Sequence, residues 1–262
     1  MNNSNSIGVF DSGLGGLSIA RRIREILPNE NLLYVADSAH GPYGDKSAAF
    51  ITQRSSAIID FLLEQKAKTI VVACNTATVS SIQELRAKYR VPIIGVEPGI
   101  KPAVFKTNTR IIGVLATTQT LKSTSFNELS SNFSDKVKIE VQACPGLMEQ
   151  VEALDLAGHK TEALVKKYVG SLLERGVDNI VLGCTHYIFL APLIRKIAGP
   201  AIEIINTDFA VAKETARRLT VANLLSSNYA LGQEQFYSSG DQPTATKQFS
   251  LLWGEPVSVS QF

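Results

Sequence analysis

A strand-like segment that ends in a cysteine occurs twice in this chain, and this repeat restricts the folds that the chain can adopt. The first copy runs from Ile70 to Thr76 and the second from Ile180 to His186, 110 residues later. In each copy an apolar run is followed by a small residue, a cysteine and two residues that can form hydrogen bonds. A weaker match pairs residues 7–12 with residues 112–117 at an offset of 105. Two matches at nearly the same offset indicate an internal duplication.

Strand-like and helix-like runs alternate within each half. Short apolar, β-branched runs are separated by stretches whose apolar residues recur at the helical period. Strands are expected at residues 7–10, 32–36, 70–73, 92–96, 111–115, 138–142 and 180–182, and helices at residues 17–27, 51–63, 147–154 and 162–174. This order predicts an α/β fold with mainly parallel sheets and helices on both faces.

The duplication predicts two pseudo-symmetric α/β domains. Residues 1–98 with 207–262 would form the first domain and residues 99–206 the second. Ligands of open α/β sheets bind outside the carboxyl ends of the strands. If the two domains face each other, both cysteine-bearing strand ends meet one cleft, where we expect the active site. The tail from Leu224 onward receives no role from the sequence.

Composition and charge argue against several classes of function. The formal net charge is only +2, and no basic block is typical of a nucleic-acid surface. The longest apolar runs, such as residues 69–73, are far too short to cross a membrane. Residues 1–6 lack the pattern of a secretory signal, so we expect a cytoplasmic protein. The first motif begins at residue 7, and we expect no long N-terminal extension.

The three cysteines are too few and too widely spaced for a disulfide framework or a zinc site, so no metal is expected. Cys144 has no repeated motif around it, and we interpret it as structural. A free thiol has a pKa of about 8.5, which falls near a helix N-terminus or a cation. Cys74 and Cys184 are both expected at strand-to-helix turns, where the helix dipole is available. Two such bases on opposite faces of one carbon are what stereochemical inversion requires: one accepts a proton as thiolate and the other donates one as thiol.

Several motifs resemble those of the glutamate racemases, within the aspartate/glutamate racemase superfamily. The motifs are Asp11-Ser12-Gly13-Leu14-Gly15-Gly16-Leu17, Ala36-Asp37 leading to Pro42-Tyr43-Gly44, Ala73-Cys74-Asn75-Thr76-Ala77, Glu97-Pro98, and Leu182-Gly183-Cys184-Thr185-His186-Tyr187. They occur in the family's order and cover most of residues 7–210. The resemblance implies interconversion of L- and D-glutamate without a cofactor. It also implies a homodimer that supplies D-glutamate for peptidoglycan, and hence for the cell wall and cell shape.

By this resemblance six residues are implied in catalysis: Cys74, Cys184, Asp11, His186, Asp37 and Glu152. Cys74 would take the proton from D-glutamate and Cys184 from L-glutamate. Asp11 would assist the first cysteine and His186 the second. Simpler interpretations remain open at this point: Asp11 could cap a helix, Asp37 could form strand-end hydrogen bonds, and Glu152 could be a solvated charge.

Substrate binding is expected to use hydroxyls, amides and backbone N–H groups. The positions that match the family are Asp11, Ser12, Tyr43, Gly44, Asn75, Thr76, Thr185 and His186. Thr118 and Thr120 lie in a hydroxyl-rich turn that would meet a carboxylate, although Thr120 could instead cap a helix. These motifs contain no Arg or Lys, so helix N-termini and neutral donors would hold the carboxylates.

Other classes of function fit less of the sequence. The turn at residues 13–16 follows a strand, and Asp37 ends the next one, as in nucleotide-binding folds, but Ser18 replaces the third glycine and the repeated cysteines stay unexplained. An aspartate racemase or another cysteine-dependent enzyme of the superfamily keeps those cysteines, and a non-catalytic binder has no feature in its favour. Ile188 and Asn206-Thr207 depart from the family pattern beside the expected site.

Overall fold

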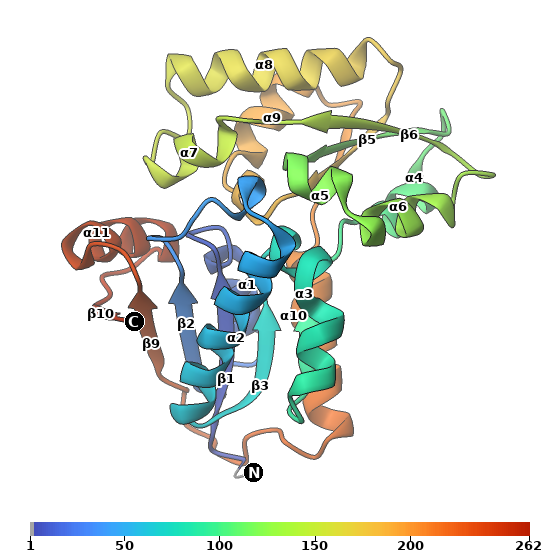
Figure 1. The fold of residues 1–262 in the computed structure, drawn as a ribbon. Helices are drawn as coiled ribbons and strands as arrows, with labels where there is room; N and C mark the ends of the chain where they lie inside the picture. The colour runs from blue at the N-terminus through green and yellow to red at the C-terminus, as the bar shows by residue number, and fades with distance from the viewer. Residues whose placement is uncertain (1–2) are drawn as a thin grey trace. The chain divides into compact units, whose positions relative to one another are not determined.

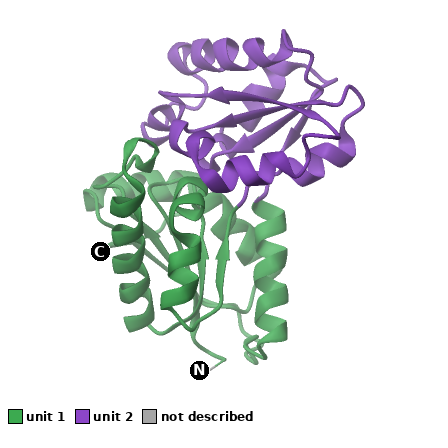
Figure 2. Ribbon diagram, turned by 45° about the vertical axis from the view of Figure 1, so that its right-hand side comes forward, with its two compact units in different colours: residues 1–96, 208–262 green, residues 97–207 purple. Residues whose placement is uncertain are grey.

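The computed structural model describes residues 3–262 and divides the chain into two compact units (Figures 1 and 2). One unit comprises residues 1–96 and 208–262, and the other comprises residues 97–207. Each unit holds one sheet with helices packed on it, and all the strand pairs described are parallel. The predicted α/β class with mainly parallel sheets is confirmed. Within the part of the chain described here, no helix is both long and apolar enough to span a membrane.

The first unit has a sheet of order β10-β9-β2-β1-β3-β4. Its elements are β1 (Ser6–Asp11), α1 (Leu17–Ile26), β2 (Leu32–Ala36), η1 (Tyr43–Asp45), α2 (Ala48–Glu64), β3 (Ala67–Val72), α3 (Asn75–Lys88), β4 (Ile93–Gly95), α10 (Asp208–Val221), β9 (Glu234–Ser238), α11 (Gln242–Trp253) and β10 (Val259–Gln261). Strands β9 and β10 come from the C-terminal segment and extend the sheet beside β2.

The second unit has a sheet of order β6-β5-β7-β8. Its elements are α4 (Ile100–Lys106), β5 (Ile111–Ala116), α5 (Thr118–Lys122), α6 (Thr124–Ser131), β6 (Lys138–Ala143), α7 (Leu147–Glu152), α8 (His159–Leu173), β7 (Asn179–Gly183), η2 (Thr185–Ile188), α9 (Ala191–Ala198) and β8 (Glu203–Ile205).

Both sheets carry helices on two faces, because successive side chains of a strand point to opposite sides. On β2, Leu33 and Val35 pack in one core with Ile58 of α2, whereas Tyr34 meets the ring of Phe249 in α11 at 5.6 Å. In the second unit, one core joins β5 and β7 to α7, α8 and α9. A separate core joins the same two strands to α4 and α6.

The duplication seen in the sequence is present in the topology. The order β2-β1-β3-β4 of the first unit matches β6-β5-β7-β8 of the second. Even the strand register is repeated: Gly8 lies opposite Ile70, and Gly113, 105 residues after Gly8, lies opposite Ile180, 110 residues after Ile70. The two slightly different offsets therefore belong to two neighbouring strands of one repeated unit. The same register carries Cys74 and Cys184 to equivalent ends of β3 and β7.

Two glycines hold the repeated helices close to their sheets. A Cβ atom on Gly8 would lie 3.1 Å from Leu62 Cδ1 of α2. The equivalent Cβ on Gly113 would lie 2.8 Å from Leu172 Cδ1 of α8, and Leu172 again follows Leu62 by 110 residues. A Cβ atom at Gly113 would force the Leu172 side chain to shift, and one at Gly8 would crowd Leu62.

We therefore expect Gly113→Ala to lower the free energy of unfolding by roughly 1–3 kcal/mol, because it overpacks a dense core. Chemical denaturation measures this change. Gly170→Ala on α8 is the matched control, because a Cβ there meets nothing within 4 Å. Alanine in mid-helix should instead stabilise the protein by roughly 0.5–1 kcal/mol. Equal stabilities of the two variants would contradict the close packing at Gly113.

Candidate active site

Cys74 lies between the end of β3 and the start of α3, and it is the N-cap residue of that helix. Its extended backbone (φ −133°, ψ 118°) points the side chain at the first turn, and the backbone N–H of Ala77 donates to Sγ at 3.4 Å. Ser12, which follows the neighbouring strand β1, brings its Oγ to 3.7 Å from the same sulfur. The thiol is 5% exposed. The helix N-terminus and a hydroxyl thus both face this sulfur, where they stabilise negative charge.

Asp11 is the last residue of β1 and is fully buried. Its Oδ1 accepts hydrogen bonds from the backbone N–H of Gly13 at 2.8 Å and from Ser12 Oγ at 3.3 Å. Helix α1 begins after Gly16, which makes no side-chain cap bond, and the bonds of Asp11 named above go to the turn before that helix. Asp11 closes the turn that carries Ser12, which places a carboxylate next to the residue that contacts Cys74.

Asp37 follows β2 and is the centre of a side-chain network in the first unit. Its buried carboxylate accepts from Tyr43 Oη at 2.6 Å and from Arg54 Nε and Nη2 at 2.9 and 2.8 Å, and His40 Nδ1 lies 2.9 Å away. Burial alone would raise the pKa of Asp37, but the hydrogen bonds from Arg54 and Tyr43 hold it below its ordinary value. These are side-chain partners, so Asp37 does more than form strand-end hydrogen bonds.

Tyr43 begins η1, just after a cis peptide bond between Gly41 and Pro42. Its ring is 1% exposed and packs in the same core cluster as Cys74 and Ala77. Burial and the neighbouring Asp37 carboxylate raise the pKa of Tyr43, so its hydroxyl stays a donor. The other predicted binding residues of this unit lie at the same end of the sheet: Gly44 in η1, and Asn75 and Thr76 in the first turn of α3.

Cys184 directly follows β7, but the helix after it is not the expected α-helix. It caps η2, a 3-10 helix of four residues, without a side-chain cap bond, and α9 starts only at Ala191. Backbone bonds from Tyr187 to Cys184 and from Phe189 to His186 close these tight turns at 3.1 Å. The expectation that both cysteines use an α-helix dipole is therefore wrong for Cys184, because one short 3-10 turn aligns too few peptide dipoles.

His186 and Glu152 take the place of the dipole at Cys184. Cys184 Sγ lies 3.8 Å from His186 Nδ1, and His186 Nε2 lies 2.7 Å from Glu152 Oε1. Burial alone would lower the pKa of His186, but the hydrogen bonds to Cys184 and Glu152 raise it well above its ordinary value. Glu152, at the end of α7, is paired and only 24% exposed, so it is not an isolated solvated charge. The thiol, imidazole and carboxylate form one chain.

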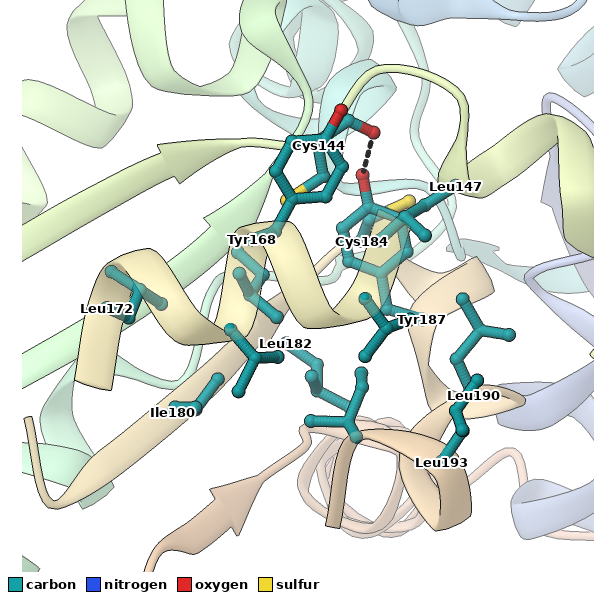
Figure 3. Close-up of a cluster of buried hydrophobic side chains, with 14 of the residues drawn as sticks. Cys144, Leu147, Tyr168, Leu172, Ile180, Leu182, Cys184, Tyr187, Leu190 and Leu193 are labelled. Atoms are coloured by element: carbon teal, nitrogen blue, oxygen red, sulfur yellow. Dashed lines mark hydrogen bonds between the residues drawn. The ribbon is translucent and has the colours of Figure 1, made fainter. Parts of the chain in front are cut away.

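The remaining cysteine belongs to the apolar core of the second unit (Figure 3). Cys144 is 2% exposed, its thiol donates to the backbone oxygen of Gln142 at 3.3 Å, and burial raises its pKa. Tyr187 Oη donates to the Cys144 backbone oxygen at 3.3 Å, and Tyr168 Oη donates to that of Pro145 at 2.7 Å. Both tyrosine hydroxyls thus anchor the backbone around Cys144, which agrees with a structural role.

The threonine turn follows β5, next to the strand that carries Cys184. Thr117 caps α5, because its Oγ1 accepts the backbone N–H of Thr120 at 3.2 Å. The suggestion that Thr120 is the cap is therefore wrong; its own hydroxyl accepts from Thr117 at 3.0 Å and is fully buried. Thr118 follows β5 and is half-buried, and Thr185 follows the parallel neighbour β7 and is buried, so both lie at the same sheet end as Cys184.

Arg54 contacts a predicted site residue, Asp37, but was not found by the motifs. It belongs to none of the motifs, and its partner Asp37 lies 17 residues earlier in the chain. The signal was its spacing on α2: it is three residues after the buried Ile51 and four before the buried Ile58. A charged residue on the buried face of a helix needs a partner.

Comparison with known proteins shows the family to which this chain belongs. The family model described as Asp/Glu/Hydantoin racemase matches residues 7–214. The glutamate racemase of Methylococcus capsulatus is 53% identical over 251 residues, which cover 96% of this chain and 93% of that protein.

Solved structures agree with this. The glutamate racemase isoform RacE1 of Bacillus anthracis is 30% identical, with a TM-score of 0.90 over 100% of this chain and 98% of that one. The glutamate racemase of Francisella tularensis, solved in complex with D-glutamate, is 27% identical, with a TM-score of 0.87 over 99% and 98%. The chain therefore belongs to the Asp/Glu/Hydantoin racemase family and, within it, to the glutamate racemases.

Proposed function

We propose that this enzyme interconverts L- and D-glutamate and that Cys74 and Cys184 are its two bases. The observation that carries the proposal is the repeated register, which puts one cysteine at the equivalent end of β3 and β7. A relative of the same fold was solved with D-glutamate, which supports glutamate as the substrate. The two units, residues 1–96 with 208–262 and residues 97–207, would be the two domains of the enzyme.

In the L-to-D direction, Cys184 acts as the thiolate. It takes the α-proton, so the Cα–H bond breaks and an S–H bond forms, and the electron pair left on Cα delocalises into the substrate carboxylate. Cys74, as a thiol, then delivers its proton to the opposite face of Cα and becomes the thiolate. The D-to-L direction reverses these steps, with Cys74 as the base. After each turnover the two cysteines have exchanged protonation states.

The neighbours of each cysteine would support these states. A protonated His186, held by Glu152, places positive charge beside Cys184 when it is a thiolate. At Cys74 the first turn of α3 and the Ser12 hydroxyl have the same effect, and Asp11 and Asp37 orient this half of the site. Backbone N–H groups and the side chains of Asn75, Thr76, Thr118, Thr120 and Thr185 would hold the substrate's charged groups. Such fixed donors are effective because they need no reorganisation during the reaction.

We further propose that the product D-glutamate feeds peptidoglycan synthesis in the cytoplasm, in support of the cell wall and cell shape, and that the enzyme works as a homodimer without a cofactor. These proposals follow from membership of the glutamate racemases.

The proposal is tested by incubating the purified protein with D-glutamate in heavy water without added cofactor. Polarimetry should show rotation decaying to zero, and proton NMR should show loss of the α-proton signal as deuterium replaces it. D-aspartate is the matched substrate control, with one methylene fewer. Exchange with aspartate but not with glutamate would move the substrate to the related racemase activity. No exchange with either amino acid would refute the proposed reaction.

A further inference from the structure

Arg54 has a contact pattern that the proposed reaction does not use. Its guanidinium binds Asp37 through two parallel hydrogen bonds, from Nε to Oδ2 and from Nη2 to Oδ1. The carboxylate is fully buried and the arginine side chain is 21% exposed. Such a two-point contact sets the rotation of a carboxylate as well as its charge, which a lysine cannot do.

The C-terminal segment touches the same pair. The ring of Phe262 lies 5.8 Å from the Arg54 guanidinium and meets Phe61 of α2 edge-on at 5.0 Å. Phe262 is held in register with the sheet by a backbone bond to Ser238 at 2.9 Å. The next residue, Ser239, accepts the backbone N–H of Ala39 at 3.1 Å, and its hydroxyl helps to hold the pKa of Asp37 below its ordinary value. Residues about 200 positions apart in sequence therefore converge on Asp37.

Asp37 connects the contacts of Arg54 to the core around Cys74 through Tyr43. Tyr43 Oη donates to the carboxylate at 2.6 Å, and the Tyr43 ring packs in the core cluster that contains Cys74. The segment between β2 and η1 has no regular secondary structure, so its conformation depends on such tertiary contacts. A Tyr43 ring that shifts would alter the packing around the thiol.

We propose that Arg54 is a positioning residue for the Cys74 half of the active site, and that Phe262 and Ser239 hold the Arg54–Asp37–Tyr43 chain in place. This role rests on the proposed function of Cys74. This gives the C-terminal segment a role in the reaction, because Ser239 and Phe262, which directly follow β9 and β10, restrain the segment from Asp37 to Tyr43.

The first test compares the steady-state kinetics of Arg54→Lys and Phe262→Ala with those of the unchanged enzyme. We expect kcat to fall by about 10- to 100-fold in Arg54→Lys, the size of effect that follows from loss of a hydrogen bond to a charged group. KM should stay near its original value, and the melting temperature should fall only slightly, because lysine keeps a positive charge opposite Asp37. Phe262→Ala should lower kcat less, whereas Phe262→Tyr, which keeps a ring over the guanidinium, should restore it.

Arg217→Lys is the matched control. Arg217 makes the same two-point contact, from Nε and Nη2 to Glu214 at 2.6 and 2.7 Å, but on the exposed surface of α10. The kcat of Arg217→Lys should equal that of the unchanged enzyme. Unchanged kcat in Arg54→Lys would overturn the proposal. A raised KM at constant kcat would also overturn it, because Arg54 would then bind substrate instead of positioning Cys74.

A second readout does not depend on the reaction. Iodoacetamide labelling followed by mass spectrometry gives the alkylation rate of each cysteine separately. In Arg54→Lys we expect faster alkylation of Cys74, with the rates of Cys144 and Cys184 in the other unit unchanged. Faster alkylation of all three cysteines, with a lower melting temperature, would show a merely structural role. If the protein did not racemise glutamate, this labelling pattern would still distinguish that failure from failure of the Arg54 proposal.

Discussion

Cys74→Ser and Cys184→Ser should each lower kcat/KM for glutamate racemisation by roughly 10²- to 10⁴-fold, the usual contribution of a positioned acid or base. A serine hydroxyl is a far weaker acid than a thiol, so it cannot supply the anionic base at neutral pH. The loss should occur with both enantiomers, because each direction needs one cysteine as base and the other as acid. Polarimetry with purified L- and D-glutamate measures it.

Cys144→Ala is the control for these variants. Its thiol is buried in the core and bonds only to the backbone oxygen of Gln142 among the contacts described, so racemisation should persist. Removing one buried sulfur should lower the free energy of unfolding by roughly 1 kcal/mol. Full activity in either serine variant would rule out the two-base reaction, as would an equal loss in Cys144→Ala.

Glu152→Gln and His186→Asn should have the next largest effects. Loss of the charge on Glu152 weakens a hydrogen bond to a charged partner, which corresponds to about 10- to 100-fold in rate. His186→Asn removes the imidazolium beside Cys184 and should cost at least as much. Glu152→Gln keeps the shape of the side chain, so a loss of rate without a loss of stability in that variant would identify an electrostatic role. Retention of full rate by Glu152→Gln would remove Glu152 from the catalytic set.

Protonated His186 should support the Cys184 thiolate at low and neutral pH and lose this effect as the pH rises. The pKa of His186 is raised, so its imidazolium persists above pH 6.5 and is lost only as the pH rises through the raised value. In Glu152→Gln one of the causes of that rise is gone, and the proton should be lost at a lower pH. Support for the Cys184 thiolate would then fail earlier on the alkaline side. NMR titration of the imidazole signal that disappears in His186→Asn measures the shift, and an unchanged titration would contradict it.

The fold class and the duplication were predictable, because apolar periodicity and repeated motifs in the sequence reflect local secondary structure. The alternation of apolar runs with helical periods predicted the α/β class, since burial of one strand or one helix face leaves its period in the sequence. The repeat at offsets of 105 and 110 predicted the duplication, and the register of β1 on β3 and of β5 on β7 matches it. The positions of Cys74 and Cys184 at strand ends followed from the same repeat. The strands and helix of the C-terminal segment were not predicted.

The partners of the site residues depended on tertiary structure. The contact of Arg54 with Asp37, that of Phe262 with Arg54 and that of Glu152 with His186 each join segments that no local pattern links. Likewise, the 3-10 turn after Cys184 was not visible in a motif that closely resembles the one after Cys74. The sequence by itself determined the class of fold, the duplication and the positions of Cys74 and Cys184 at equivalent strand ends. These features depend on periodicity and on short motifs. Only the tertiary structure decided what surrounds each thiol, because those contacts form when distant segments are packed together.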